Sequence, residues 1–367
     1  MGIISSIFRK NSVPKISTYE EFWTWFLHNE HTFFKIIRSG KNIDKAFFPR
    51  LSPMLDQLHN GILLMTAVDD KGNVELALSA AAEVKIIPYI EDIIDAAPSI
   101  PGWKFTSLKP AIDMDKTMLK MAGKIFSIDN MFFYENEDPN MRDNIDLVII
   151  HSDFMESDRS NFEIGGSMFL ENYLGELNML TMIDSLEFIA KEDAKAVLIP
   201  IFKLMDYLIW REKEFVEKYG DLRYLEEDDR RNCLEWKLEN GKPLFAIVNS
   251  SVLEWDGKAS HPWVIEISIK YNGAEDNGLP DSRTAELLDQ FQDQLVEQLQ
   301  APEGFLHISV ETADGLSRIC FACADFRKPV RVVDRTIREF KGQLEVEYEV
   351  YRDKYWQTFE RYTPQVL

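Results

Sequence analysis

The sequence has little cysteine and no long apolar run, and these shortages exclude several classes of protein. Its 367 residues include three cysteines, an odd number that is too small for a disulfide framework and is typical of a reducing compartment. No segment approaches the roughly 18 consecutive apolar residues of a membrane span. The segment Met1–Lys10 has neither the apolar core nor the cleavage site of a signal peptide. We therefore expect a cytoplasmic protein that does not enter a membrane.

Positive charge is also in short supply. The chain has 41 basic residues against 62 acidic ones, which gives a formal net charge of −21. Nucleic-acid affinity depends largely on the neutralisation of phosphates by lysine and arginine, and an acidic surface repels phosphates and anionic lipids. The composition therefore disfavours nucleic acid and membrane as partners. It fits a basic protein partner, or solubility alone.

Recognisable catalytic motifs are missing as well. Cys320 and Cys323 have the spacing of a metal or redox pair, but residues three apart on the expected strand point to opposite faces. His151–Asp153 and Gly165–Ser167 form neither a triad nor a nucleophile elbow. We therefore predict no catalytic residues, no metal and no cofactor. A hydrolase site near His151, or in a groove between domains, is the alternative.

The first half of the chain alternates helical and strand patterns. Thr18 and Glu21 form a capping box for a helix that ends at Gly40. A second helix is expected to begin at Ser52 as its cap, with Pro53 in the first turn. Apolar strands over 62–68 and 74–80 then form a hairpin. Further helices are expected over 84–97, 169–177 and 199–219, and further strands over 103–108, 125–134, 145–151 and 180–188.

From Trp236 onward, the polarity pattern predicts strand, strand, helix, strand, strand, helix and strand. In the strand over 263–271, isoleucines alternate with polar residues, so one face is apolar and the other is charged. Two helices, one beginning near Pro280 and one over 330–340, each present one apolar side. Two helices on one face of an antiparallel sheet are typical of the ferredoxin-like arrangement.

We expect an α+β protein of two domains. The N-terminal α+β domain comprises residues 1–220 and ends with a helix that bridges the domains. The charged segment 226–231 has no apolar period and is expected to be an exposed connection. Residues 221–367 then form the ferredoxin-like domain. The order of elements from Val74 onward is similar, which leaves a divergent version of the same plan open for the first domain.

The sheet face opposite the two helices is the predicted binding surface. Strand alternation gathers charged side chains there, where they either pair with one another or meet a partner protein. Arginines along one side of the last helix offer a second strip, which could grip an anionic group or pair with nearby glutamates. The candidate binding residues are Glu266, Lys270, His307, Glu311, Arg318, Glu345, Glu347, Glu349, Arg331 and Arg335.

Short motifs in the second half have a recognisable order. They are Gly241-Lys242-Pro243 before a strand, Asn277-Gly278-Leu279-Pro280 before a helix, Thr312 with Gly315 and Arg318 in a hairpin, and Trp356 followed by Tyr362. In this order and spacing, the segment from Trp236 to Tyr362 resembles the bacterial domain-of-unknown-function family six-nine-five. The preceding part is similar to the companion region of uncharacterised proteins from Bacteroides-like bacteria, through Pro101-Gly102-Trp103 and Leu174-Gly175-Glu176.

The resemblance implies a cytoplasmic bacterial protein and supplies no catalytic residues. Some relatives of the domain are joined to a segment similar to the acidic inhibitor of ribonuclease E, which implies an inhibitory, protein-binding role. This chain has no clear copy of that acidic segment, which counts against the inhibitory role. Its acidity also suits an immunity protein that neutralises a basic toxin. We therefore predict a noncatalytic protein-binding or regulatory module, with a hydrolase as the competing class.

Overall fold

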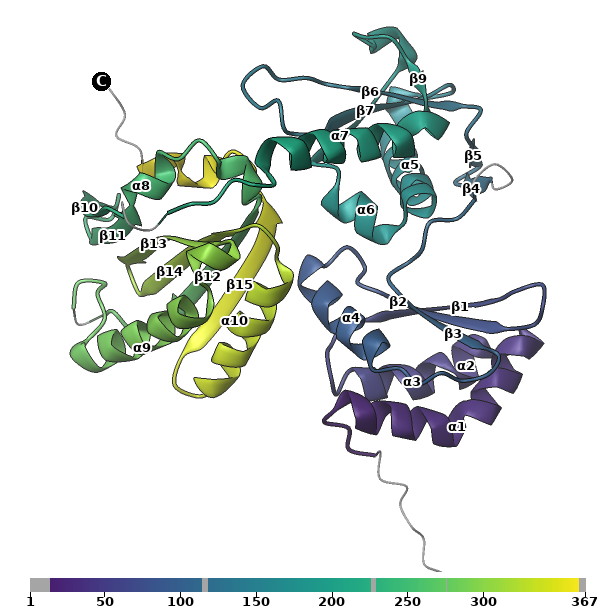
Figure 1. The fold of residues 1–367 in the computed structure, drawn as a ribbon, viewed down its shortest axis with the longest axis horizontal. Helices are drawn as coiled ribbons and strands as arrows, with labels where there is room; N and C mark the ends of the chain where they lie inside the picture. The colour runs from purple at the N-terminus through teal and green to yellow at the C-terminus, as the bar shows by residue number, and fades with distance from the viewer. Residues whose placement is uncertain (1–13, 114–117, 226–228, 275, 363–367) are drawn as a thin grey trace, which may run out of the picture. The chain divides into compact units, whose positions relative to one another are not determined.

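The computed structural model describes residues 14–113, 118–225, 229–274 and 276–362 (Figure 1). Helices and strands are mixed, which confirms the predicted α+β class. The chain divides into two compact units, Met1–Pro110 and Ala111–Leu367. The domain boundary expected at Gly220 lies inside the second unit and stays a prediction. Expectations about Met1–Lys10 and about residues 226–228 fall outside the described residues.

The first unit combines four helices with a three-stranded sheet. The hairpin is confirmed, and the strand after it lies parallel to the second hairpin strand. The helices are α1 (Tyr19–Ser39), α2 (Ile43–Ala46), α3 (Phe48–Leu55) and α4 (Ile87–Asp95), and the strands are β1 (Leu63–Val68), β2 (Val74–Ser79) and β3 (Trp103–Ser107).

The ends of α1 follow the sequence prediction, whereas the start of α3 does not. The Thr18 hydroxyl accepts a hydrogen bond from the Glu21 backbone N–H, and Gly40 closes α1 with a φ of 63° that favours glycine. α3 begins at Phe48, so Ser52 lies inside the helix and is not its cap. An earlier proline, Pro49, occupies the first turn, where the missing N–H costs no helical hydrogen bond.

The second unit begins with two small sheets and three helices. A four-stranded sheet has the order β8-β7-β6-β9, with β7 and β8 parallel, and β4 pairs with β5 alone. The strands are β4 (Leu119–Met121), β5 (Lys124–Phe126), β6 (Met131–Glu135), β7 (Asp146–His151), β8 (Ser185–Ile189) and β9 (Ile199–Pro200), and the helices are α5 (Arg159–Leu174), α6 (Glu176–Thr181) and α7 (Leu204–Tyr219). Because these strands and those of the first unit belong to separate sheets with parallel pairs, this half does not repeat the antiparallel plan as one sheet.

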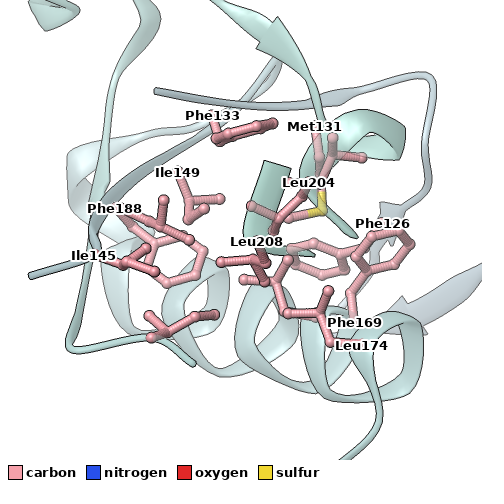
Figure 2. Close-up of a cluster of buried hydrophobic side chains, with 14 of the residues drawn as sticks. Phe126, Met131, Phe133, Ile145, Ile149, Phe169, Leu174, Phe188, Leu204 and Leu208 are labelled. Atoms are coloured by element: carbon pink, nitrogen blue, oxygen red, sulfur yellow. The ribbon is translucent and has the colours of Figure 1, made fainter. Parts of the chain in front are cut away.

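A cluster of buried apolar side chains joins these helices to the four-stranded sheet. Figure 2 shows Leu204 and Leu208 of α7 among the side chains of Phe133 and Phe169, and all four are fully buried. The helix expected over 199–219 is therefore confirmed from Leu204 onward, anchored by its first turns.

Two adjacent glycines bring α5 close to this cluster. A Cβ added to Gly165 would lie 2.3 Å from the ring of Phe126, and one added to Gly166 would lie 2.2 Å from the ring of Phe188. The backbone N–H groups of residues 165–167 lie inside α5 and bond within the helix. This segment therefore supplies no free backbone donors.

The C-terminal part of the second unit is a six-stranded sheet with the order β10-β11-β13-β14-β12-β15, in which all neighbours are antiparallel. Figure 1 shows α9 and α10 on one face of it. The strands are β10 (Arg231–Lys237), β11 (Pro243–Asn249), β12 (Trp263–Lys270), β13 (Phe305–Ala313), β14 (Leu316–Cys323) and β15 (Glu345–Arg352), and the helices are α8 (Ser250–Leu253), α9 (Ser282–Gln298) and α10 (Arg327–Glu339).

The order strand, helix, strand, strand, helix, strand runs from β12 to β15, as the sequence predicts. Two strands precede it, whereas only one was expected, because β10 has no apolar alternation that would indicate a strand. The ferredoxin-like assignment stays a prediction. Short 3₁₀ turns also occur among the described residues: η1 (Val84–Ile86), η3 (Glu156–Asp158), η4 (Lys191–Asp193), η5 (Ile201–Lys203), η7 (Lys258–Ser260), η8 (Ala301–Glu303) and η9 (Gln357–Tyr362).

Candidate functional site

On the predicted binding face, Lys270 of β12 neutralises part of the acidic edge strand β15. Its Nζ lies 3.2 Å from a carboxylate oxygen of Glu345 and 3.2 Å from one of Glu347. The hydrogen bonds to Glu347 and Glu345 raise the pKa of Lys270 above its ordinary value. Glu349 makes no ion pair with any described residue and stands opposite Glu266 in the ladder. The edge strand therefore keeps some unbalanced negative charge.

Arg318 of β14 forms the second group of ion pairs on this face. Its guanidinium lies 2.9 Å from Glu311 and 3.5 Å from Glu266. The Tyr362 hydroxyl, at the end of η9, donates to Glu311 over 3.2 Å, and only 6% of Glu311 is exposed. These charged side chains therefore pair with one another across the strands, which is one of the two possibilities that the sequence leaves open. η9 contacts one end of the face.

A β-bulge removes His307 from the predicted face. The register of β13 against β14 shifts between His307 and Ser309, so that His307 pairs with Phe321. Phe321 in turn pairs with Ile265, on the apolar face of the sheet. Burial lowers the pKa of His307 to about 3, and its Nδ1 accepts a hydrogen bond from Arg231 over 3.0 Å. The placement of His307 beside the charged residues was wrong, because strict alternation does not hold across a bulge.

Arg331 and Arg335 lie on α10, away from the charged strands. Arg335 donates to the side-chain oxygen of Gln298, the last residue of α9, and Arg331 also has a partner. The structure therefore does not bring these arginines together with Glu266 and Lys270. The contact of Arg335 joins α10 to α9.

The two cysteines of β14 lie on opposite faces of the sheet, as predicted. Cys320 pairs with Glu266 in the ladder, and Cys323 pairs with Trp263 three residues away. Both are buried, and burial raises the pKa of Cys320 to about 12 and that of Cys323 well above its ordinary value. Neither thiol is therefore available as a thiolate nucleophile at neutral pH.

His151 ends β7 with both ring nitrogens bonded to the backbone. Its Nε2 lies 2.8 Å from the carbonyl oxygen of Ile125, and its Nδ1 accepts from the Asp153 N–H over 3.0 Å. The ring packs between Phe126 and Phe162, with centroids 5.1 and 5.0 Å away, and 2% of the residue is exposed. A histidine held in this way positions the loop and has no nitrogen left for proton transfer to a substrate.

A cleft of about 760 Å³ lies elsewhere in the second unit. Its wall combines the loop after β6, the outer half of α7 and the ends of β12 and β15. Trp210 and Phe215 of α7 and Trp263 of β12 line it, together with Arg352 and Lys354. A volume of several hundred cubic ångströms is typical of clefts that bind a ligand.

Two cations share one carboxylate at the floor of this cleft. The Nζ of Lys354 lies 2.7 Å from Asp184 and 2.5 Å from the carbonyl oxygen of Asp143. The guanidinium of Arg352 lies 3.3 Å from the other oxygen of Asp184 and donates to the carbonyl of Thr181. Burial lowers the pKa of Lys354 and that of Arg352, while the attraction of Asp184 opposes the change.

Asp143 receives a lysine and a tyrosine from α7 and a second tyrosine from the end of the sheet. Lys218 lies 2.9 Å from its carboxylate, and the hydroxyls of Tyr219 and Tyr355 each donate over 2.8 Å. Burial acts to raise the pKa of Asp143, but these hydrogen bonds hold it below its ordinary value. The dipeptide Lys-Tyr occurs at 218–219 and again at 354–355. This repeat is the sequence signal that could have indicated the arrangement.

Glu135 ends β6 with its carboxylate against α7. The Tyr207 hydroxyl donates to it, and Arg211 lies 3.3 Å away. The side chain of Glu135 is 7% exposed, and burial raises its pKa from 4.5 to about 7, although the charge of Arg211 opposes this shift. Glu135 is therefore divided between protonated and ionised forms near neutral pH.

The rim of the cleft has acidic side chains that the described residues leave without ion pairs. Glu137 and Asp138 come from the loop, and Glu212 and Glu214 come from α7. Arg142 is the unpaired cation among the lining residues, so four negative charges and one positive charge leave −3 at the rim. Deeper in the cleft, four cations meet three carboxylates, which leaves one positive charge in excess; the cations are Arg211, Lys218, Arg352 and Lys354, and the carboxylates are those of Glu135, Asp143 and Asp184.

The six-stranded sheet and the motifs between its strands identify the C-terminal part of the chain. Residues 237–362 match the model of the family of unknown function DUF695. This confirms the resemblance found in that segment. The DUF695 segment contributes Trp263, Arg352 and Lys354 to the cleft, whereas Glu135 and Asp143 precede it. No curated protein and no solved structure matches the chain.

Within the described ranges, no group of three or more histidine, cysteine, aspartate or glutamate side chains is arranged to hold a metal ion, in the DUF695 segment or before it. None of the helices seen in the structure is both long and apolar enough to pass through a bilayer.

Proposed function

We propose that the protein is a noncatalytic binding module that receives a basic segment of a partner protein in the cleft beside α7. The unpaired acidic rim around an exposed aromatic residue carries this proposal. Trp210 lines the cleft and is 53% exposed. Exposed tryptophans surrounded by polar groups are frequent anchors in protein interfaces. Glutamates at 137, 212 and 214 would attract lysine or arginine side chains of the partner.

Glu135 provides a place for one basic side chain of the partner. Burial keeps the pKa of Glu135 near 7 even with Arg211 beside it. A second cation close to this carboxylate would favour its ionised form. Binding would therefore release a proton from the fraction of molecules in which Glu135 is protonated.

The sheet face predicted from the sequence is the weaker candidate for a docking surface. Lys270 and Arg318 already neutralise most of the glutamates around them. A basic partner would have to displace these cations, whereas the cleft rim offers carboxylates without an ion pair. Glu349 alone would not hold a partner.

The bulk properties agree with a role in the bacterial cytoplasm. A low cysteine content suits a reducing compartment, and the net charge of −21 suits a basic partner better than nucleic acid or a membrane surface. An inhibitor or immunity-like protein that neutralises a basic protein would have these properties. We therefore propose that the protein is an inhibitor or immunity-like protein of this kind.

A hydrolase in the same cleft is the second candidate. Glu135 has a raised pKa and Asp143 a lowered one, and carboxyl groups displaced in opposite directions can act as general acid and base. However, Asp143 already accepts from three donors, and Glu135 contacts both Tyr207 and Arg211. The lining residues that the structure describes also include no serine, cysteine or histidine. The geometry therefore favours binding over hydrolysis.

The proposal is tested with a fluorescein-labelled peptide of alternating lysine and alanine and with two charge-reversed proteins. The rim variant carries lysine in place of Glu137, Glu212 and Glu214. The control variant carries lysine in place of Glu345, Glu347 and Glu349 on β15, so its net charge changes by the same amount. Fluorescence anisotropy should show an affinity loss of at least about tenfold, or 1.4 kcal/mol, in the rim variant. The control variant should bind within about threefold of the unchanged protein.

Two outcomes would contradict the proposal. Equal losses in both variants would mean that the peptide responds only to net charge. A loss confined to the control variant would move the site to the sheet face. Mass spectrometry of the peptide separates the two candidate functions, because cleavage by the unchanged protein that is abolished by Glu135→Gln would establish the hydrolase.

A further inference from the structure

Helix α7 has an exposed apolar stripe on a side that does not line the cleft. We define the α7 stripe as Phe202, Ile209 and Val216, which are 49%, 54% and 57% exposed. Ile209 and Val216 lie seven positions apart in α7, and seven residues of an α-helix return to within about 20° of the same direction. Phe202, seven positions before Ile209, lies in the turn η5 that leads into α7. The buried side of α7 is formed by Leu204 and Leu208 (Figure 2). A single exposed apolar side chain needs no explanation, but three large ones in a column form a patch of the kind that marks an interaction site.

A column of opposite charges runs beside the α7 stripe. Asp206 and Lys213 are also seven positions apart, so they lie on one flank of the helix. Asp206 makes no ion pair within the described ranges. Lys213 is 75% exposed and reaches Glu217 of the same helix only at 3.8 Å. Both charges are therefore open to a partner.

We propose that the α7 stripe is a homodimer interface in which α7 packs antiparallel on α7 of a second copy, about a two-fold axis near Ile209. Such an axis places Ile209 against Ile209 and brings Val216 of one copy toward Phe202 of the other. The apolar side chains of each copy then cover those of its partner.

The charges specify the direction of the two helices. With a rise of about 1.5 Å per residue, Asp206 lies about 4.5 Å before Ile209 and Lys213 about 6 Å after it. In the antiparallel arrangement, equal flanks face each other, so Asp206 of one copy lies beside Lys213 of the other, and the pair occurs twice. In a parallel arrangement, the flank with Asp206 and Lys213 would instead face the opposite flank of the second copy, so these charges would not meet. Self-complementarity of this kind points to a second copy as the occupant.

The contact area of one short helix is small, so the dimer is expected to be weak and to depend on protein concentration. Sedimentation velocity of the full chain, from low micromolar to submillimolar concentration, should show a shift from monomer to dimer. Ile209→Glu, which places a charge in the seam, should abolish the shift. Ile164→Glu is the matched control, because Ile164 is 51% exposed on α5 and does not belong to the stripe. It should leave the shift unchanged.

A charge exchange tests the antiparallel geometry separately from general stickiness. Lys213→Asp should weaken the dimer, because it opposes two aspartates on each side of the axis. The double variant Asp206→Lys with Lys213→Asp should restore association to near the original level. A monomer at every concentration, an equal effect of the two isoleucine variants, or failure of the double variant to recover would each overturn the proposal. Far-ultraviolet circular dichroism shows whether each variant is folded.

Discussion

The sheet face of the DUF695 segment and the cleft beside α7 are built from the same types of charged residue, but their charges are balanced differently. On the sheet, the antiparallel register places side chains of neighbouring strands about 5 Å apart, so Lys270 and Arg318 reach glutamates across the ladder. At the cleft rim, a loop and a helix meet without a common register, and Glu137, Glu212 and Glu214 have no cation opposite them. Regular pairing neutralises charge locally, whereas an irregular junction leaves charge for a partner.

The largest effect is expected from Lys354→Met, because the cleft floor holds its charges out of water. The change would leave Asp184, whose side chain is 10% exposed, with Arg352 and the Ile145 N–H as its remaining partners. It would also remove the donor to the Asp143 carbonyl. Breaking a buried ion pair typically costs about 3–5 kcal/mol, and because Arg352 remains we expect about 3 kcal/mol. Urea unfolding of the full chain, followed by circular dichroism, measures this loss.

Lys270→Met is the matched control on the sheet face. This lysine also contacts two carboxylates, but its side chain is 52% exposed and water screens the interaction. The unfolding midpoint of this variant should equal that of the unchanged protein within error. Equal losses for the two lysines would mean that both regions hold their charges in the same way.

Arg318→Met should have an effect between those of Lys354→Met and Lys270→Met. Arg318 pairs with a buried glutamate, so it distinguishes the buried part of the sheet face from the exposed part around Lys270. Glu311 would keep the Tyr362 hydroxyl and the more distant Arg361 guanidinium, 3.7 Å away, as partners. Leaving a buried charged group partly unpaired should lower the free energy of unfolding by about 1–2 kcal/mol. Adding Glu311→Gln should recover part of this loss in the same unfolding measurement. A double variant that is less stable than the single one would show that the charge of Glu311 is not the cause.

A last predicted effect is a pH dependence of stability that comes from Glu135 in the cleft. The pKa of Glu135 is raised from 4.5 to about 7 in the folded protein, so between these values the folded state holds more protons than the unfolded state. The contribution of Glu135 to stability is therefore fully present below pH 4.5 and is lost as pH rises through about 7. Glu135→Gln should remove this dependence, so the two unfolding curves should diverge as pH rises through that range. Carbon NMR of the carboxyl groups would contradict the prediction if Glu135 titrated near 4.5.

The sequence predicts those elements whose signals are local. Alternation is strict in β12 and β15, and both strands have the expected faces. The caps at Thr18 and Asp281 involve side chains that bond to backbone N–H groups three residues later. In each case, neighbouring residues contain all the information that the element requires.

Other elements depend on contacts that no local pattern contains. β10 has only one partly buried residue, Leu234, so its strand character comes from the pairing with β11. α5 is interrupted in the sequence by Gly165 and Gly166, which are required by the packing on two phenylalanine rings. The bulge at His307 is visible only in the register with the neighbouring strand.

The cleft could not be located from the sequence for the same reason. Lys354 bonds to Asp184 and to Asp143 across 170 and 211 positions of the chain. The sequence predicts a groove between domains as one possible site but does not indicate any of these residues. Their types are ordinary for exposed loops, and only their meeting in space raises or lowers their pKa values.

The burial of Cys320 and Cys323 on β14 has a practical consequence for spectroscopy. Because both of their thiols are buried, Cys233 on the edge strand β10 is the one exposed thiol of the three in the chain. A maleimide dye or spin label should therefore attach at a single position of the native sequence, without prior removal of other cysteines. The protein provides its own attachment point, from which distances to a labelled peptide or to a second copy can be measured.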